Sequence, residues 1–304
     1  MAADQTSETS QKGDAARGFA YALTAYILWG FLPFYMKAVA HVSPFEVIAH
    51  RVVWSVPIAA AVLVMLGRTA EIIKALTTPR MLGMACLTAA LISLNWGVYI
   101  WAIASGRALD AALGYFINPL FSIFMGAVLL REKLSRFQMA AIVLAALAVA
   151  LLTWHAGKLP WVSLALTVSW GFYAFFRKTL PIGPTQGFLL EVLLLTPPAI
   201  AYIIYLMSTG QAHFMAGTPV DTWLLVASGV VTATPLIFYG NGAKLLKLST
   251  IGIMQYIAPS MIFLIAVFIF KEPFDTVRLV AFMMIWAALL VYTVPGLIRS
   301  KAAS

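Results

Sequence analysis

Long apolar runs alternate with short polar clusters along most of the 304-residue chain. The runs are apolar on every face and do not alternate with a period of two, so they predict helices and not β-barrel strands. A helix needs roughly 20 residues to cross a hydrocarbon core about 30 Å thick. Segments of about this length can be placed at 18–37, 44–66, 81–104, 109–130, 136–155, 160–178, 184–208, 220–240, 249–270 and 274–298. The pattern therefore predicts an all-α integral membrane protein with ten transmembrane helices.

The composition points the same way. Hydrophobic residues make up 62% of the chain and charged residues only 10%, whereas a soluble domain carries about 25% charged residues. This excludes a water-soluble enzyme, and the short connections leave no room for a separate catalytic or nucleic-acid-binding domain. Polar residues 1–16 predict a disordered cytoplasmic tail, and 300–304 a C-terminal tail. Cys86 is the single cysteine, which excludes an intrachain disulfide and a thiolate metal site.

The net charge of +9 is distributed unevenly between the two predicted faces. Of the 20 basic residues, 14 fall on the side of the N-terminus, and Arg51 lies inside a span. The five on the opposite side are Lys37, Arg107, Lys158, Lys271 and Arg278. An excess of basic residues in short loops marks the cytoplasmic face, so we expect both termini in the cytoplasm. The excess of basic residues that gives the net charge of +9 is then explained by the orientation of the chain in the membrane, and we expect no nucleic-acid partner.

The second half of the sequence repeats the first at an offset of 140–141 residues. Matching positions are Trp29 and Trp170, Pro44 and Pro184, Tyr99 and Tyr239, Pro119 and Pro259, and Arg131-Glu132 and Lys271-Glu272. Each half has five predicted spans, an odd number, so the second half enters the membrane from the opposite face. The sequence thus predicts two inverted five-helix repeats, 17–156 and 157–299. Many secondary transporters use this architecture for alternating access around a midplane site.

Several motifs carry a resemblance to a known family. They are Ala25-Tyr26, Trp29-Gly30, Glu46-Val47-Ile48-Ala49-His50-Arg51, Asn95-Trp96, Leu113-Gly114-Tyr115-Phe116-Ile117-Asn118-Pro119 and Leu248-Ser249-Thr250-Ile251-Gly252. From about residue 17 to 295 the chain resembles the RarD/YddG-like exporters of the EamA family, in the drug/metabolite transporter (DMT) superfamily. The resemblance implies a bacterial inner-membrane exporter of small metabolites, with amino acids, particularly aromatic ones, as the leading substrate class. Together with the polar residues, it implies a substrate site between spans 1, 3, 4, 6, 8 and 9, with spans 5 and 10 peripheral.

Two tryptophans near the middle of their spans are the first cavity candidates. Trp29 and Trp170 lie too deep for the usual interfacial aromatic belt, and each precedes a glycine. The repeat would place them on opposing walls, where they suit stacking on an aromatic or apolar side chain. Helix packing is the alternative role for both.

Polar and aromatic residues of the third span form a second group. Asn95 and Tyr99 are four residues apart and share a helical face, Trp101 follows them, and Tyr239 is the repeat counterpart of Tyr99. Their amide and hydroxyl groups would hydrogen-bond the carboxylate or amine of a substrate. Hydrogen bonding between helices is an equally good interpretation.

Two prolines in equivalent spans are hinge candidates. A proline inside a helix removes one hydrogen bond and frees the carbonyl group four residues earlier; Pro119 and Pro259 would free those of Tyr115 and Gln255. The plainer alternative is that proline is tolerated in membrane helices. The polar residues around both prolines complete the predicted cavity: Tyr115, Asn118, Gln255 and Tyr256.

The ionisable residues inside the spans have several interpretations. Ser43 and Glu46 have the spacing of a helix capping box. Arg51 and Glu191 occupy equivalent repeat positions, each roughly 11 Å inside its helix, and end within roughly 8 Å of each other in depth. A salt bridge, a gate and a proton-coupling carboxylate all fit this pair, and His50 next to Arg51 is a further gate candidate.

Enzymatic constellations are absent from the sequence. The histidines are scattered without metal-ligand spacing, and there is no phosphate-binding loop, so we expect no metal, no cofactor and no direct use of ATP. We expect the protein to be a monomer in the lipid bilayer. Its expected partners are a small-molecule substrate and, if Glu191 is a proton-coupling site, protons. Two alternatives stay open: a transporter of drugs or nucleotide-linked sugars, and an integral-membrane enzyme acting on lipid.

Overall fold

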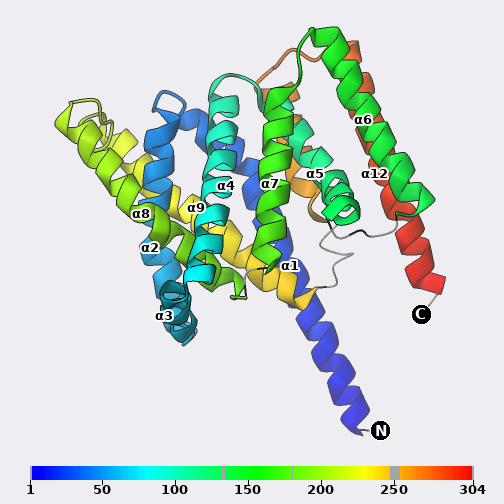
Figure 1. The fold of residues 1–304 in the computed structure, drawn as a ribbon, viewed down its shortest axis with the longest axis horizontal. Helices are drawn as coiled ribbons and strands as arrows, with labels where there is room; N and C mark the ends of the chain where they lie inside the picture. The colour runs from blue at the N-terminus through cyan, green and yellow to red at the C-terminus, as the bar shows by residue number, and fades with distance from the viewer. Residues whose placement is uncertain (1, 130, 132–133, 180, 247–253, 303–304) are drawn as a thin grey trace.

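The structure is a computed structural model that describes residues 2–129, 131, 134–179, 181–246 and 254–302, and in these residues all regular structure is helical. A π-helical turn, η1 (Ile265–Ile269), continues one of the helices. The α-helices are α1 (Ala2–Ala38), α2 (Pro44–Met65), α3 (Ala70–Thr77), α4 (Pro79–Ala104), α5 (Ala108–Leu129), α6 (Arg136–Ala156), α7 (Trp161–Thr179), α8 (Pro184–Ser208), α9 (Pro219–Leu245), α11 (Ile257–Leu264) and α12 (Thr276–Ala302) (Figure 1).

Seven of the described helices are long and apolar enough to cross a membrane. Shorter apolar helices lie at Trp161–Phe176, Ile257–Ile269 and Thr276–Tyr292. The prediction of an all-α membrane protein is therefore confirmed. Both ends of the chain lie at the lower end of the molecule in Figure 1.

The predicted boundaries are wrong in two places. Residues 2–16 do not form a disordered tail but begin α1, because the segment lacks proline and contains good helix formers such as Ala, Gln and Lys. The short helix α3 lies in the connection between the second and third predicted spans. The segment 249–270 is not one helix: its residues 249–253 lie outside the described part, and α11 begins only at Ile257.

Helix starts recur at the offset of the sequence repeat. Three pairs of helices begin 140 residues apart: α2 and α8 at Pro44 and Pro184, α4 and α9 at Pro79 and Pro219, and α6 and α12 at Arg136 and Thr276. Proline opens four of these helices because the first helical position needs no N–H donor. Arg131 and Lys271, also 140 apart, have positive φ values of 53° and 52°. Local backbone conformation therefore follows the same offset as the residues.

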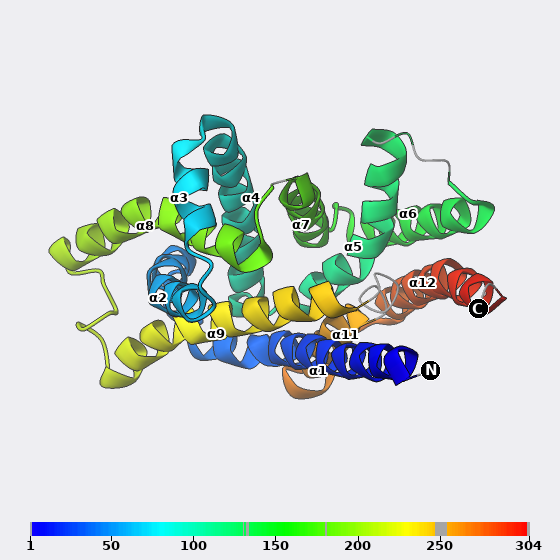
Figure 2. The same cartoon turned by 90° about the horizontal axis from the view of Figure 1, so that it is seen from below.

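The packing of the helices follows the offset as well. Helix α1 packs against α9 and α11, and its counterpart α7 packs against α4 and α5. Helix α2 packs against its own counterpart α8. Helices α6 and α12 pair with each other at one side of the molecule (Figure 2). The short helix α3 lies against α4 and α8.

Small residues allow α5 and α7 to approach closely. A Cβ atom added at Gly114 would lie 2.7 Å from the carbonyl oxygen of Ser163. The hydroxyl groups of Ser163 and Thr167 donate hydrogen bonds across this contact to the carbonyl oxygens of Asp110 (2.6 Å) and Gly114 (2.9 Å). Small residues and interhelical hydrogen bonds replace the hydrophobic effect as the source of helix association in lipid.

Gly114→Ala should lower the stability of the folded protein by about 1–3 kcal/mol, because the new methyl group meets backbone that cannot move aside. The measurement is thermal unfolding of the purified protein in detergent. Gly83→Ala is the matched control, since a Cβ there meets nothing within 4 Å; it should leave stability unchanged or raise it by about 0.5–1 kcal/mol. Equal melting temperatures for both variants would contradict the close α5–α7 contact.

Candidate functional site

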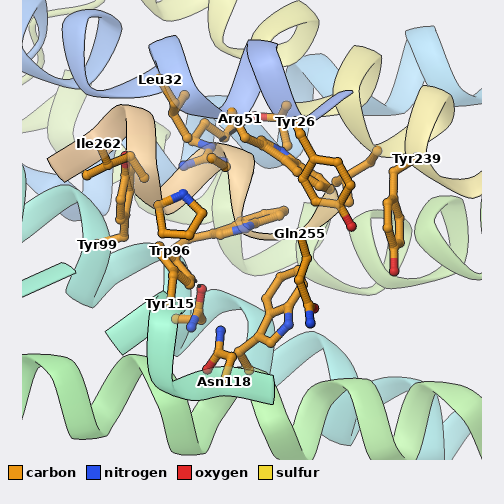
Figure 3. A pocket seen from close by; sticks show the side chains of 17 residues that line it. Tyr26, Leu32, Arg51, Trp96, Tyr99, Tyr115, Asn118, Tyr239, Gln255 and Ile262 are labelled. Atoms are coloured by element: carbon orange, nitrogen blue, oxygen red, sulfur yellow. Dashed lines mark hydrogen bonds between the residues drawn. The ribbon is translucent and has the colours of Figure 1, made fainter. Parts of the chain in front are cut away.

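A cavity of about 130 Å³ lies between the helices. Its wall is built by α1, α2, α4, α5, α7, α9, α11 and Gln255, which precedes α11 (Figure 3). The volume is close to the about 150 Å³ of an engineered apolar cavity that binds benzene. The space therefore suits a small ligand with about one ring.

Aromatic side chains form two walls of the cavity. On the α1–α9 side, the ring centroid of Trp29 lies 5.6 Å from that of Tyr26 and 5.5 Å from that of Tyr239. On the other side, the ring of Tyr115 lies 5.8 Å from Tyr99 and 6.5 Å from Trp170. Tilted and edge-to-face contacts of this kind stabilise the walls and leave ring faces available to a ligand.

Arg51 of α2 is the one cation among the described residues of the cavity wall. Its Nε donates a hydrogen bond of 2.9 Å to the hydroxyl oxygen of Thr232. Its guanidinium carbon lies 4.6 Å from the ring centroid of Trp96. Although Arg51 is only 3% exposed, its Nη1 atom has no hydrogen-bond partner in the described part of the chain. A buried, partly unpaired charge is costly.

The asparagine side chains of the cavity differ in whether their polar atoms have hydrogen-bond partners. Asn95 donates from Nδ2 to the backbone oxygen of Leu166 (3.1 Å) and to the hydroxyl of Ser169 (2.9 Å), both on α7. Asn95 thus makes the interhelical bonds that were one of its two interpretations. In contrast, Oδ1 of Asn118 and the hydroxyl of Tyr99 are buried without a hydrogen-bond partner among the described residues.

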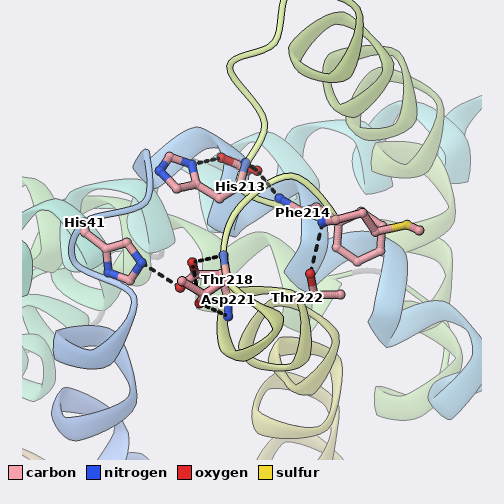
Figure 4. A network of polar contacts seen from close by, with 8 residues as sticks. His41, His213, Phe214, Thr218, Asp221 and Thr222 are labelled. Atoms are coloured by element: carbon pink, nitrogen blue, oxygen red, sulfur yellow. Dashed lines mark hydrogen bonds and ion pairs between the residues drawn. The ribbon is translucent and has the colours of Figure 1, made fainter.

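A polar network ties the α8–α9 loop to the start of α2 (Figure 4). The Glu46 carboxylate accepts hydrogen bonds from the backbone N–H groups of His213 (2.7 Å) and Phe214 (3.2 Å) and contacts Nδ1 of His213 at 2.9 Å. Beside it, Nε2 of His41 lies 2.7 Å from the Asp221 carboxylate. The predicted capping box of Glu46 is wrong, because these long-range donors engage the carboxylate and Ser43 makes no side-chain cap.

Comparison with known proteins places the chain in a family. The profile of the EamA-like transporter family matches residues 16–154. An uncharacterized transporter of Vibrio cholerae is 40% identical over 296 residues, which cover 97% of this chain and 98% of the relative. Protein RarD of Streptomyces exfoliatus is 39% identical, with 91% and 88% covered, and Protein RarD of Escherichia coli K12 is 36% identical, with 95% and 97% covered. The chain belongs to the EamA family, as a RarD-like transporter.

A solved structure described as "Crystal structure of protein" resembles this EamA-family chain with a TM-score of 0.59. It covers 93% of this chain and 98% of its own, at 18% identity. That likeness concerns the fold alone. Membership of the family identifies the chain as a multi-pass membrane transporter and leaves its substrate open.

Most residues predicted for the site of this EamA-family transporter line the cavity. They are Trp29, Asn95, Tyr99, Tyr115, Asn118, Trp170, Tyr239 and Gln255, together with the gate candidate Arg51 and the hinge candidate Pro259. The predicted substrate site lay between spans 1, 3, 4, 6, 8 and 9. Arg51 shows that the second span, α2, also contributes to the wall. Among the residues that the structure describes, none from α6 or α12 lines the cavity, which agrees with the peripheral place expected for spans 5 and 10.

Two predicted cavity residues lie elsewhere. Trp101 is 36% exposed at the end of α4, where its ring lies 5.1 Å from that of Trp161. It has the place of an interfacial tryptophan. Tyr256 packs against the hydrophobic core formed around α5 and α12 and does not line the cavity. Trp101 lies in the last turn of α4 and not in the middle of a span, and Tyr256 lies in the turn before α11, so neither lines the cavity.

The other gate and hinge candidates are not among the described residues that line the cavity. Glu191 accepts a hydrogen bond of 3.2 Å from the hydroxyl of Tyr173, whereas Arg51 bonds Thr232 within the wall. Nδ1 of His50 accepts a bond of 3.1 Å from Trp54 Nε1, so His50 lies behind the wall. Pro119 is buried inside α5.

Pro259 departs from the prediction of a proline inside a helix. It stands in the first turn of α11, which begins at Ile257. There the missing N–H removes no hydrogen bond within the helix. The chain is instead interrupted just before α11, at a non-helical turn formed by Gln255 and Tyr256. A hinge at this place remains a prediction.

The sequence analysis did not identify two chemically informative wall residues, Tyr26 and Thr232. Tyr26 stands three residues before Trp29, and Thr232 stands seven before Tyr239, so each shares a helical face with a predicted residue. Trp96 belongs to the polar and aromatic group of the third span, and the Arg51 guanidinium lies over its ring.

Glu46→Gln should destabilise the EamA-family transporter by about 1–3 kcal/mol, because an amide presents a donor to the N–H groups that now reach a carboxylate. Thermal unfolding in detergent measures the change. Asp14→Asn is the matched control: Asp14 is exposed and its contact with Arg17 is 4.0 Å long, so its loss should have almost no effect. Unchanged stability of Glu46→Gln would contradict a structural role for the network.

Proposed function

We propose that this transporter is a secondary exporter of small metabolites in the bacterial inner membrane. Its proposed substrates are amino acids with aromatic or hydrophobic side chains and related carboxylates. The observation that carries the proposal is Arg51, a buried and incompletely paired cation in a wall otherwise built from aromatic, apolar and neutral polar side chains.

A substrate carboxylate would complete the bonding of Arg51. A guanidinium has five N–H donors in a planar fork, and a carboxylate accepts two of them side by side. Thr232 accepts a hydrogen bond from Nε of Arg51 alone, so Nη1 and Nη2 of Arg51 are left for a ligand. Pairing would remove the cost of a buried single charge.

The rest of the wall suits the other parts of an amino acid. The buried oxygens of Tyr99 and Asn118, which lack partners among the described residues, are acceptors for an ammonium group. The two aromatic walls around Trp29 and Trp170 would receive an apolar or aromatic side chain. Phosphorylated cargo would call for several cations, and the described wall offers one.

Alternating access is the proposed mechanism, supported by an asymmetry between the repeats. Helix α1 packs against α4, and their ends share one buried core that includes Met36, Val39, Ile100 and Ile103. The counterparts α7 and α9 make no extended contact in the described part of the chain. An exchange of these two arrangements would open the cavity to the other side.

The 14-to-5 distribution of basic residues supports termini in the cytoplasm. In that orientation the core of α1 and α4 would close the outer side, which supports our proposal of an inward-facing state. Function as a monomer without a cofactor is part of the same proposal.

Uncharged amphipathic drugs are a second candidate substrate class. A relative from Pseudomonas aeruginosa, 32% identical over 282 residues, is named chloramphenicol-sensitive protein RarD. The aromatic walls would bind such a compound, but Arg51 would then have no role in its recognition.

Arg51→Gln should reduce transport of phenylalanine in proteoliposomes roughly tenfold to hundredfold, the scale of a lost charged hydrogen bond. Arg51→Lys should retain part of the rate, since it keeps the charge and loses the fork. Lys37→Gln is the matched control, because Lys37 is exposed at the end of α1. Flux panels should include phenethylamine, which lacks the carboxylate, and chloramphenicol.

Three outcomes separate the candidates. Selective loss of carboxylate transport in Arg51→Gln supports the amino-acid proposal. Wild-type phenylalanine flux in Arg51→Gln contradicts it, and chloramphenicol flux that only Trp29→Ala and Trp170→Ala abolish favours the drug candidate. Unimpaired flux of every substrate in both tryptophan variants would contradict the cavity as the transport site.

Glu191→Gln tests proton coupling. If Glu191 carries the proton, the variant should lose the acceleration of flux by a pH gradient while binding substrate as before. The comparison needs proteoliposomes with and without an imposed pH gradient. Full rate and unchanged pH dependence in the variant would exclude Glu191 as the coupling site.

A further inference from the structure

A second cavity, of about 250 Å³, lies where the ends of α6 and α4 meet the starts of α5, α7 and α12. It shares no lining residue with the central cavity. Its polar rim consists of Arg107, Asp110, His155, Lys158, Asp275 and Arg278. Its apolar floor includes Leu109, Leu113, Leu152 and Phe282.

Both acids of the rim are already engaged. The Asp110 carboxylate accepts a hydrogen bond of 2.9 Å from Nε of Arg107. Asp275 accepts one of 2.8 Å from the backbone N–H of Arg278, and its other oxygen lies 3.3 Å from Nε2 of His155. The bond from Arg278 keeps the pKa of the Asp275 carboxyl below its ordinary value. Asp275 therefore stays ionised and held at the start of α12.

The basic groups of the rim retain free donors. Arg107 uses Nε for Asp110, and Arg278 uses one Nη1 bond of 3.0 Å to the backbone oxygen of Pro273. Each guanidinium has five N–H donors, so most remain. The Lys158 ammonium makes no hydrogen bond or ion pair with any described residue. Three cations with spare donors thus surround one opening, which favours an anion.

Neighbouring aromatic residues place this rim at the level of lipid headgroups. Trp101 and Trp161 are partly exposed beside the cavity, and the Arg107 guanidinium lies 5.7 Å and 5.8 Å from their ring centroids. Tryptophans concentrate at the interface between membrane and water. From the rim, Leu113, Leu152 and Phe282 continue about one turn deeper along their helices, toward the hydrocarbon.

We propose that this cavity binds an anionic phospholipid. The phosphate group would accept hydrogen bonds from Lys158, Arg278 and the spare donors of Arg107. The start of an acyl chain would lie over Leu152 and Phe282. The combination of a cationic rim with an apolar floor distinguishes a lipid from free phosphate, which has nothing to place against the floor.

The test is native mass spectrometry of the full-length protein released from micelles that contain phosphatidylglycerol. Lys158→Gln and Arg278→Gln should each weaken retention of the lipid about fivefold, the contribution of one basic residue near an anionic surface. Lys37→Gln is the matched control, because Lys37 belongs to the same predicted face and lies over the ring of Phe270, outside this cavity. It should retain the lipid as the unmodified protein does.

Two further arms keep the proposal falsifiable if a variant folds poorly. On the unmodified protein, phosphatidylglycerol should be retained in preference to phosphatidylcholine, and inorganic phosphate should not displace it. Equal retention of both lipids, or of phosphatidylglycerol in all variants, would overturn the proposal. Displacement by millimolar phosphate would make this a soluble-anion site and would likewise overturn binding of a lipid.

Discussion

Hydrocarbon offers no hydrogen-bond partner, so polar groups inside the bundle must be satisfied by the chain itself. Hydroxyl groups meet this condition by bonding to backbone oxygens, within a helix as in Ser55 to Arg51, or between helices as in Thr167 to Gly114. Asn95 does the same across α4 and α7. Three of the described residues with a buried polar atom that lacks a partner, Arg51, Tyr99 and Asn118, line the central cavity, and they define its chemistry.

The scaffold around that cavity is built twice. Helix starts, and residues with a positive φ, recur at an offset of 140. Two glycines in equivalent positions also make equivalent contacts: Gly30 of α1 packs against Met261, and Gly171 of α7 packs against Phe121. The packing is nevertheless unequal, since α1 contacts α4 while α7 and α9 make no extended contact among the described residues. The proposed alternating access would exchange these two arrangements.

The candidate site was predictable to the extent that depth in the membrane indicates it. Trp29, Tyr115 and Asn118 are polar or aromatic residues in the middle of apolar spans, and they line the cavity. Trp101 was predicted by the same reasoning, but it lies in the last turn of α4, against Trp161. Glu46 was misread because its capping motif is local, whereas its partner His213 lies 167 residues away.

The sequence by itself determined the membrane class, most helix boundaries, the repeat and the depth of the candidate residues. These properties depend on hydrogen bonds within each helix and on apolar runs long enough to span a bilayer, so they can be read locally. Only the tertiary structure decided which helical faces meet, that Arg51 bonds Thr232 across 181 residues, and that a second, cationic cavity forms near α12. These depend on helix rotation and on contacts between distant segments, which no local pattern encodes.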